Sequence, residues 1–155
     1  MKQIFILLAG VLAIAASASA VASARSAGSA TARASRATEV LLHHTSLGSI
    51  LTTSSGLTLY EFTHDHGSEN SCVKIHGCAQ AWPALETSGQ PTAGSGVKAS
   101  LLSTIRIPGG AKQVTYAGHP LYTFSEDTRG ATGYVGVNAF GGNWDALSAS
   151  GHAVR

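Results

Sequence analysis

The sequence LYEFTHD occupies residues 59–65, and a close copy, LYTFSED, occupies residues 121–127. Each copy places a Tyr and a Phe two residues apart and ends on an Asp three residues after the Phe. The copies are 62 residues apart (122 − 60 = 62), and the same offset relates Trp82 to Trp144. A constant offset across several anchor residues indicates a tandem duplication, in which each copy is one supersecondary unit.

The motif side chains are expected to be structural. Successive side chains of a strand point to opposite faces, so Tyr60 and Phe62 share one face of their strand. Aromatic side chains at this spacing in both copies predict a shared core, in which a buried Tyr or Trp needs a partner for its polar hydrogen. A carboxylate that follows a strand end accepts backbone N–H groups and shapes the turn. The residues to which we assign these roles are Tyr60, Phe62, Asp65, Trp82, Tyr122, Phe124, Asp127 and Trp144.

Short β-prone runs lead into both motifs and are separated by turn residues such as Gly118, where a tight hairpin requires positive φ. The runs are residues 40–44, 49–53 and 57–63 in the first copy and residues 101–107, 111–116 and 119–125 in the second. A single meander of this size is marginal alone, which gives the duplication a physical reason. We therefore predict an all-β fold of two tandem antiparallel β-meander repeats that share one core, with little helix beyond residues 79–81. The pattern leaves open whether the sheets close as a sandwich or as a barrel.

The N-terminal part of the chain has the features of an export signal. Residues 4–16 form an apolar run that is too short to span a bilayer comfortably. Small residues in alternate positions lead up to Ala20 and Ala24, as in signal-peptidase sites. We predict a signal peptide over residues 1–24, cleaved after either alanine, and a disordered Ala/Ser/Arg-rich tether over residues 25–38. No integral membrane span is expected after cleavage.

The remainder of the chain divides at the connector between the two copies. The first repeat with its connector covers residues 40–99, and the second repeat covers residues 100–155. The connector itself, residues 86–98, is rich in Gly, Pro, Ser and Thr and is long enough to be mobile.

Charged residues are sparse, and the formal net charge of the chain is +2. No basic patch or run of like charge accompanies the repeats, so we expect neither a nucleic-acid partner nor an anionic membrane surface. The polarity of the surface must come mainly from hydroxyl and amide groups, which suits a sheet better than a long charged helix.

Cys72 and Cys78 are the only cysteines of the chain. In an exported protein, two cysteines at this spacing favour a structural disulfide. Closing so short a loop stabilises the fold by about 2 kcal/mol in the chain-entropy treatment. At the repeat offset Cys72 aligns with Tyr134 and Cys78 with Phe140, so the first copy has a cross-link where the second has aromatic packing.

The chain resembles a family of secreted bacterial repeat proteins and predicted lipoproteins that carry a Tyr-x-aromatic-x-x-Asp motif. Besides the two motifs, the resemblance rests on AQAWP at residues 79–83, QVTYAG at residues 113–118 and GGNW at residues 141–144. It covers about residues 45–152 and implies no established activity. The leader has no cysteine to accept a lipid, which departs from the lipoprotein members and favours a freely secreted product.

Histidines suggest an alternative, metal-binding role. His64 and His66 flank Asp65 and would share one face of a strand, and His76 lies between the two cysteines. Neutral imidazoles near a carboxylate bind copper or zinc. None of the three has a histidine counterpart at the repeat offset, which argues against a site common to both repeats. A calcium loop at residues 65–70 is disfavoured, because the segment lacks the ligand spacing of an EF-hand.

The sequence contains no recognisable catalytic motif, and we predict neither an enzyme nor a bound cofactor. Ser, His and Asp residues are present, but no nucleophile elbow accompanies them. Asp65 and Asp127 would form a glycosidase-like pair only if they faced each other across a pseudo-two-fold axis. A small hydrolase is therefore the third function to consider.

The function that we expect is a secreted, non-catalytic binding or structural domain of the bacterial cell envelope, located outside the cell or in the periplasm. Its partner is not identified by the sequence. The alternative is a secreted metal-handling protein, for copper or zinc, or a redox-accessory protein. Buried motif residues would favour the first role, converging histidine nitrogens the second, and two aspartates facing one cleft the third.

Overall fold

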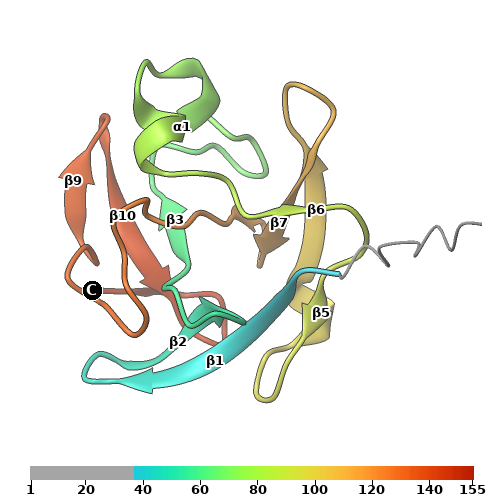
Figure 1. Ribbon diagram of the computed structural model, residues 1–155, viewed down its shortest axis with the longest axis vertical. Coiled ribbons are helices and arrows are strands. Elements are labelled where there is room, and N and C mark those ends of the chain that lie inside the picture. Colours follow the sequence, from blue (N-terminus) through green and yellow to red (C-terminus); the bar gives the residue numbers. More distant parts are fainter. Residues whose placement is uncertain (1–36) are drawn as a thin grey trace, which may run out of the picture. The chain divides into compact units, whose positions relative to one another are not determined.

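The computed structural model describes residues 37–155, which are drawn in colour in Figure 1. The predicted signal peptide and residues 25–36 of the predicted tether lie outside the described residues. The helical elements are α1 (Cys78–Ala81) and two 3₁₀ turns, Cys72–Lys74 and Ala99–Leu101. The strands are β1 (Glu39–Thr45), β2 (Gly48–Thr53), β3 (Tyr60–Phe62), β4 (Glu86–Thr87), β5 (Thr92–Ala93), β6 (Leu102–Arg106), β7 (Lys112–Tyr116), β8 (His119–Pro120), β9 (Val137–Ala139), β10 (Gly142–Leu147) and β11 (Ala153–Val154).

The strands of the described residues form small sheets that are antiparallel except where β5 joins β1. One sheet has the order β2-β1-β5, a second has β4-β7-β6 with β8 beside β7, and a third has β11-β10-β3 with β9 beside β10. Each repeat begins with a hairpin, β1–β2 or β6–β7. The chain then returns along the second strand, through a bridge between Thr52 and Thr58 or through β8. The predicted all-β fold of two antiparallel repeats is thereby confirmed.

The turn between β7 and β8 has the geometry predicted for it. Ala117 and Gly118 have φ values of 50° and 88°. Positive φ at both central residues is what a two-residue hairpin turn of type I′ requires, and glycine adopts it without steric cost. The turn pairs Tyr116 with His119 and so fixes the register of β8.

The connector between the repeats is held by strand pairing, so the expectation that residues 86–98 are mobile is wrong. β4 pairs with β7, and β5 pairs with the start of β1. The Gly94 N–H donates to the Val40 carbonyl at 2.8 Å. A Cβ at Gly94 would lie 2.1 Å from the Leu41 side chain, so a glycine lets the connector pack closely on β1. The composition of the connector did not reveal these pairings. Glycine is typical of a mobile loop, but in a short strand it can also mark a close approach of two backbones.

Thr38, the last residue of the predicted tether, belongs to the domain. Its hydroxyl donates to the Glu86 carbonyl at 2.8 Å, and its own carbonyl accepts the Thr92 N–H at 3.0 Å. These bonds attach the start of β1 to the connector, so the contacts of the first repeat begin before residue 40.

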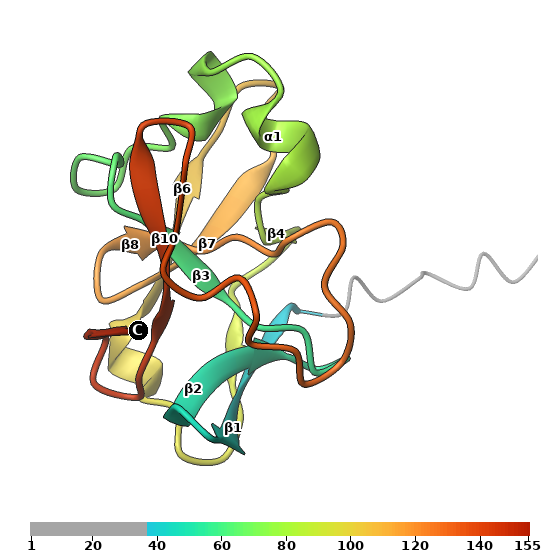
Figure 2. The same ribbon diagram turned by 90° about the vertical axis from the view of Figure 1, so that its left-hand side faces the viewer.

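The two repeats exchange strands at the centre of the domain. β3 of the first repeat lies beside β10 of the second (Figure 2). Their register places Phe62 opposite Trp144. In the other direction, Ala84 of the first repeat forms a bridge with Tyr122 of the second. The Tyr60 N–H donates to the Tyr122 carbonyl at 2.9 Å, and the Tyr122 N–H donates to the Tyr60 carbonyl at 3.0 Å. Equivalent residues of the two repeats thus make equivalent bonds to each other, as in a pseudo-two-fold arrangement. Each motif is therefore completed by the Trp-bearing segment of the other repeat. The strand predicted over residues 119–125 is wrong in its length, because β8 ends at Pro120 and the second motif pairs only through isolated bridges of Tyr122.

Both faces of the motif strands are buried, and each face has its own cluster of side chains. The aliphatic cluster contains Val40, Leu51, Leu59, Val114, Tyr116, Leu121 and Leu147. The aromatic cluster contains Tyr60, Phe62, Cys72, Cys78, Trp82, Tyr122 and Trp144. Both clusters draw side chains from both repeats, which confirms that the repeats share their core and shows that the motif strands divide it.

The predicted disulfide joins Cys72 to Cys78, with the Cα atoms 5.3 Å apart. Both cysteines are fully buried in the aromatic cluster. Their counterparts in the second repeat, Tyr134 and Phe140, pack against the same cluster. The second repeat therefore fills with aromatic rings the region that the first repeat closes with a covalent bond.

Removing the disulfide is expected to lower the free energy of unfolding. The cysteines are 6 residues apart in the sequence, and the chain-entropy treatment of so short a loop gives about 2 kcal/mol. The double variant Cys72→Ala, Cys78→Ala should show this loss in urea denaturation. Wild type under reducing conditions is the control and should lose a similar amount. A double variant as stable as the oxidised wild type would contradict the expectation.

Candidate functional site

The motif Phe and Trp residues of the two repeats form an aromatic column of four rings, in which three are stacked in parallel and the fourth is tilted. Phe62 stacks on Trp144 with ring centroids 4.1 Å apart and planes at 7°, and Trp144 stacks on Trp82 at 4.0 Å and 4°. Trp82 in turn contacts Phe124 at 4.5 Å and 41°. The rings therefore alternate between the first and the second repeat. Both tryptophans are buried, as predicted, and the column joins the repeats through direct aromatic packing.

Tyr60 and Tyr122 stand edge-on to this column, each against the tryptophan of its own repeat. The Tyr60 and Trp82 centroids are 5.0 Å apart with planes at 80°, and those of Tyr122 and Trp144 are 5.2 Å apart with planes at 88°. This geometry places the positive edge of one ring against the negative face of the other and contributes about 0.5–1.5 kcal/mol per pair beyond burial. The Trp144 ring N–H donates to the Ala139 carbonyl at 3.3 Å.

The motif aspartates act across the repeats. The Tyr60 hydroxyl donates to Asp127 Oδ2 at 2.8 Å, and the Tyr122 hydroxyl donates to Asp65 Oδ2 at 2.8 Å. Asp65 also shapes its turn as predicted, because its Oδ1 accepts the Ser71 N–H at 2.7 Å. Asp127 departs from that prediction, since its Oδ1 is buried without a hydrogen-bond partner among residues 37–155. The two reciprocal Tyr–Asp hydrogen bonds thus tie each motif to the other.

Burial sets the protonation of these pairs. It raises the pKa of the Tyr60 and Tyr122 hydroxyls above their ordinary value, and the bonded carboxylates add to the rise. Burial also raises the pKa of the Asp65 and Asp127 carboxyls, while the hydrogen bonds that these groups accept oppose the rise. The tyrosines are therefore held as hydrogen-bond donors, and each carboxylate binds a proton more readily than an exposed one.

Comparison with known protein families identifies the family of this sequence. A family described as a secreted repeat of unknown function matches residues 42–86 and 103–148, one match for each copy of the motif. The chain belongs to this family. Neither a curated protein nor a solved structure matches it. The family is described as secreted, and the Cys72–Cys78 disulfide fits a location outside the cell or in the periplasm, because disulfides persist in these oxidising environments.

Within the described part of this secreted repeat protein, the helices are all too short or too polar to cross a membrane. The family match covers both motif strands and both tryptophan segments, which are the parts that the repeats exchange. The resemblance expected from the motif residues is thus confirmed.

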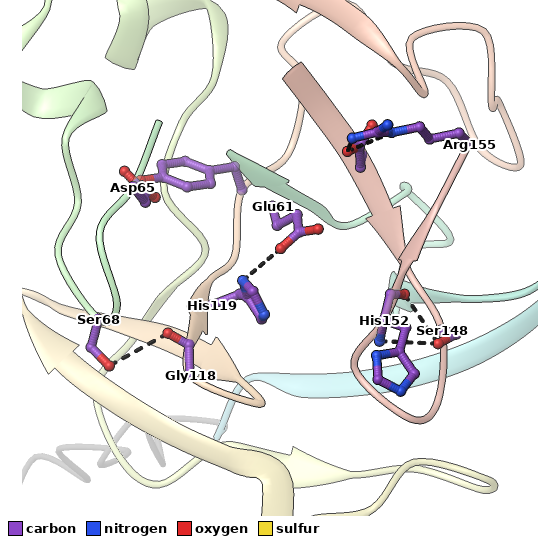
Figure 3. Close-up of polar contacts among 10 residues, drawn as sticks. Glu61, Asp65, Ser68, Gly118, His119, Ser148, His152 and Arg155 are labelled. Carbon is purple, nitrogen blue, oxygen red and sulfur yellow. Dashed lines mark hydrogen bonds and ion pairs between the residues drawn. The ribbon is translucent and has the colours of Figure 1, made fainter. Parts of the chain in front are cut away.

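A second polar group lies on the other face of the motif strand and was not predicted from the sequence. Glu61 and Asp145 are directly opposite in the β3–β10 register, with side chains 8% and 0% exposed. His119 Nδ1 lies 2.5 Å from Glu61 Oε2, and Arg155 Nη2 lies 2.9 Å from Asp145 Oδ2 (Figure 3). The hydrogen bond to Glu61 raises the pKa of His119, and the hydrogen bond to Asp145 raises the pKa of Arg155. An acidic residue directly after Trp144 was the one signal in the sequence, and the pairing of Glu61 with the distant His119 gave no signal.

The histidines predicted as metal ligands are exposed. The rings of His64 and His66 have centroids 6.1 Å apart, and His64 stacks on Phe62 at 5.6 Å. His64 Nδ1 also lies 3.3 Å from the Gly141 carbonyl oxygen. His76 projects from the loop that the disulfide closes. Across residues 37–155, no group of three or more His, Cys, Asp or Glu side chains is arranged to hold a metal ion.

The reciprocal hydrogen bonds should be visible as energetic coupling between the repeats. Tyr60→Phe and Asp127→Ala each remove one partner of the same bond. In a double-mutant cycle of unfolding free energies, we expect an interaction energy of about 0.5–3 kcal/mol. The control cycle pairs Asp127→Ala with Tyr116→Phe, because Tyr116 donates to the Ala149 carbonyl instead. That cycle should be additive to within about 0.5 kcal/mol, and additivity in both cycles would refute the exchange of partners.

Stability should fall as the pH rises above neutral. The hydrogen bond to Glu61 raises the pKa of His119 above its ordinary 6.5. Because the folded state then binds the proton more tightly, this stabilisation is complete below that ordinary value and is lost as the pH rises through the folded pKa. The raised pKa values of Asp65 and Asp127 act with the same sign at lower pH.

We therefore expect the Tm to decrease between about pH 6 and pH 9, and His119→Gln to flatten this slope. His152→Gln is the matched control, because the interactions of this exposed histidine with Ser148 use its backbone N–H and carbonyl. An unchanged slope in the His119 variant, measured by differential scanning calorimetry, would count against the contribution of this pair.

Proposed function

We propose that this secreted repeat protein is a non-catalytic module of the bacterial cell envelope. In this role the motif builds the scaffold and the remaining surface makes the contacts. The observation that carries the proposal is the internal use of the motif. Its aromatic rings stack on one another, and its aspartates accept hydrogen bonds from tyrosines of the other repeat. These side chains serve folding, which leaves binding or support of a larger structure as the task of the exposed residues.

The two motif aspartates suit this scaffold better than they suit hydrolysis. Asp65 and Asp127 each accept a tyrosine hydroxyl, which occupies an oxygen that a general acid or base would use. Hollows of about 480 and 500 Å³ on the described surface are lined by other residues. The raised pKa values of Asp65 and Asp127 follow from their burial. The packing of the motif explains this burial without a substrate.

A surface hollow lined by both repeats is the contact site that we infer. Its volume is about 500 Å³, and its lining includes Thr52, Thr53 and Ser54 of the first repeat and Arg129 of the second. Arg129 Nε donates to the Ser55 carbonyl at 3.1 Å, which positions the guanidinium, and among residues 37–155 its two terminal nitrogens are left for a ligand. A cation among hydroxyl groups suits an anionic, hydroxyl-rich polymer of the cell wall.

Co-sedimentation with purified cell walls tests this proposal. The exported wild-type protein is expected to sediment with the walls, and Arg129→Gln should reduce the bound fraction. Arg106→Gln removes the same charge from an exposed position on β6 and is the matched control. No sedimentation of the wild type would contradict an envelope-binding role, and equal losses in the two variants would contradict the site.

A further inference from the structure

The aromatic column reaches the surface of the domain at both ends. At one end the exposed His64 ring stacks on Phe62 at 5.6 Å and 25°. At the other end the partly exposed Tyr134 ring contacts Phe124 at 4.0 Å. The continuous series of rings is His64, Phe62, Trp144, Trp82, Phe124 and Tyr134. Solvent is thus connected to the buried tryptophan pair by rings in contact.

The rings at the centre of the column are those most easily oxidised by one electron. Indole and phenol lose an electron more readily than the phenyl and imidazole rings of the column. Trp82 and Trp144 are parallel to within 4° at 4.0 Å, so their π systems can share a positive charge. Tyr60 and Tyr122 contact this pair at 5.0 and 5.2 Å. An electron vacancy on the pair is therefore within contact distance of two phenols.

Each of these phenols has a proton acceptor in place. A tyrosine that loses an electron becomes strongly acidic and must release its hydroxyl proton. The Tyr60 hydroxyl already donates to Asp127 and the Tyr122 hydroxyl to Asp65, each at 2.8 Å. The proton can therefore move along an existing hydrogen bond without solvent. Burial, which raises the pKa of both carboxyls, favours its retention there.

We propose that the aromatic column is a one-electron relay that reduces oxidising radicals at the protein surface and stores the vacancy on Tyr60 or Tyr122. The oxidant is an oxygen-centred radical, such as an alkoxyl or peroxyl radical, formed outside the cell. The radical gains one electron and becomes an anion, the tyrosine becomes a neutral tyrosyl radical, and its proton moves to the bonded carboxylate. Charge and atoms balance in this step. The role goes beyond the envelope-binding scaffold and does not depend on it.

Tyr116 provides a comparison within the same molecule. It is fully buried, like Tyr60 and Tyr122, but lies in the aliphatic cluster. Its hydroxyl donates to the Ala149 carbonyl at 2.8 Å, and a carbonyl is a far weaker base than a carboxylate. If burial alone decided where a tyrosyl radical forms, all three buried tyrosines would form one equally. The relay instead predicts radicals only on Tyr60 and Tyr122, which contact both the column and a carboxylate.

The test uses the exported protein and photogenerated tris(bipyridyl)ruthenium(III) as the oxidant, with freeze-quench electron paramagnetic resonance as the readout. A Tyr134→Phe background keeps the ring at the end of the column and leaves the three buried tyrosines as the only ones. The relay predicts a tyrosyl signal in this background. Adding Tyr116→Phe should leave the signal unchanged. Adding Asp65→Asn and Asp127→Asn should abolish it and leave a tryptophan radical, since an amide accepts the hydrogen bond but not the proton.

Three results would overturn the relay. The first is the absence of a tyrosyl signal in the Tyr134→Phe background, and the second is its loss with Tyr116→Phe. The third is an undiminished tyrosyl signal in the variant with both asparagines. The first two results need no change at the Tyr–Asp pairs, so they decide the matter even if the asparagine variant fails to fold.

Discussion

The backbone pairing of Tyr60 with Tyr122 is the constraint on which the rest of the domain depends. Their two mutual hydrogen bonds bring the motif strands together at the centre. Each strand then pairs on with the tryptophan segment of the other repeat, with Phe62 opposite Trp144 on one side. A small meander is marginal in water, and here neither repeat can complete the sheet around its motif alone. The duplication is therefore a condition of folding.

The spacing of the motif follows from this arrangement. Tyr60 lies at the centre, and the residue two positions later, Phe62, points to the same face and enters the column. A tyrosine buried at this place needs an acceptor for its hydroxyl. The nearest acceptor is the aspartate that follows the end of the other motif strand, Asp127. One short pattern thus supplies a strand pairing, a stacked ring and a polar partner, provided that a second copy is present.

The sequence predicted what depends on local periodicity and missed what depends on exchange between distant segments. The hairpins β1–β2 and β6–β7, the turn at Gly118, the disulfide and the burial of both tryptophans follow from patterns within short windows. The partners of Asp65 and Glu61 lie tens of residues away and depend on which strands pair. The connector was misjudged for the same reason, since its short strands exist only beside β1 and β7, which the composition of residues 86–98 does not reveal.

The repeats share a topology but differ in how tightly it is held. In the first repeat a disulfide closes the loop after the motif, and the Ser71 N–H donates a hydrogen bond to the second carboxylate oxygen of Asp65. In the second repeat aromatic rings replace the disulfide, and Asp127 Oδ1 stays without a partner in the described residues. Burial raises the pKa of both carboxyls, and the hydrogen bonds from Ser71 oppose this rise at Asp65, whereas at Asp127 the opposing hydrogen bond comes from Tyr60. The same fold therefore gives its two Tyr–Asp pairs unequal environments, one supported by the loop that the disulfide closes and the other by aromatic packing.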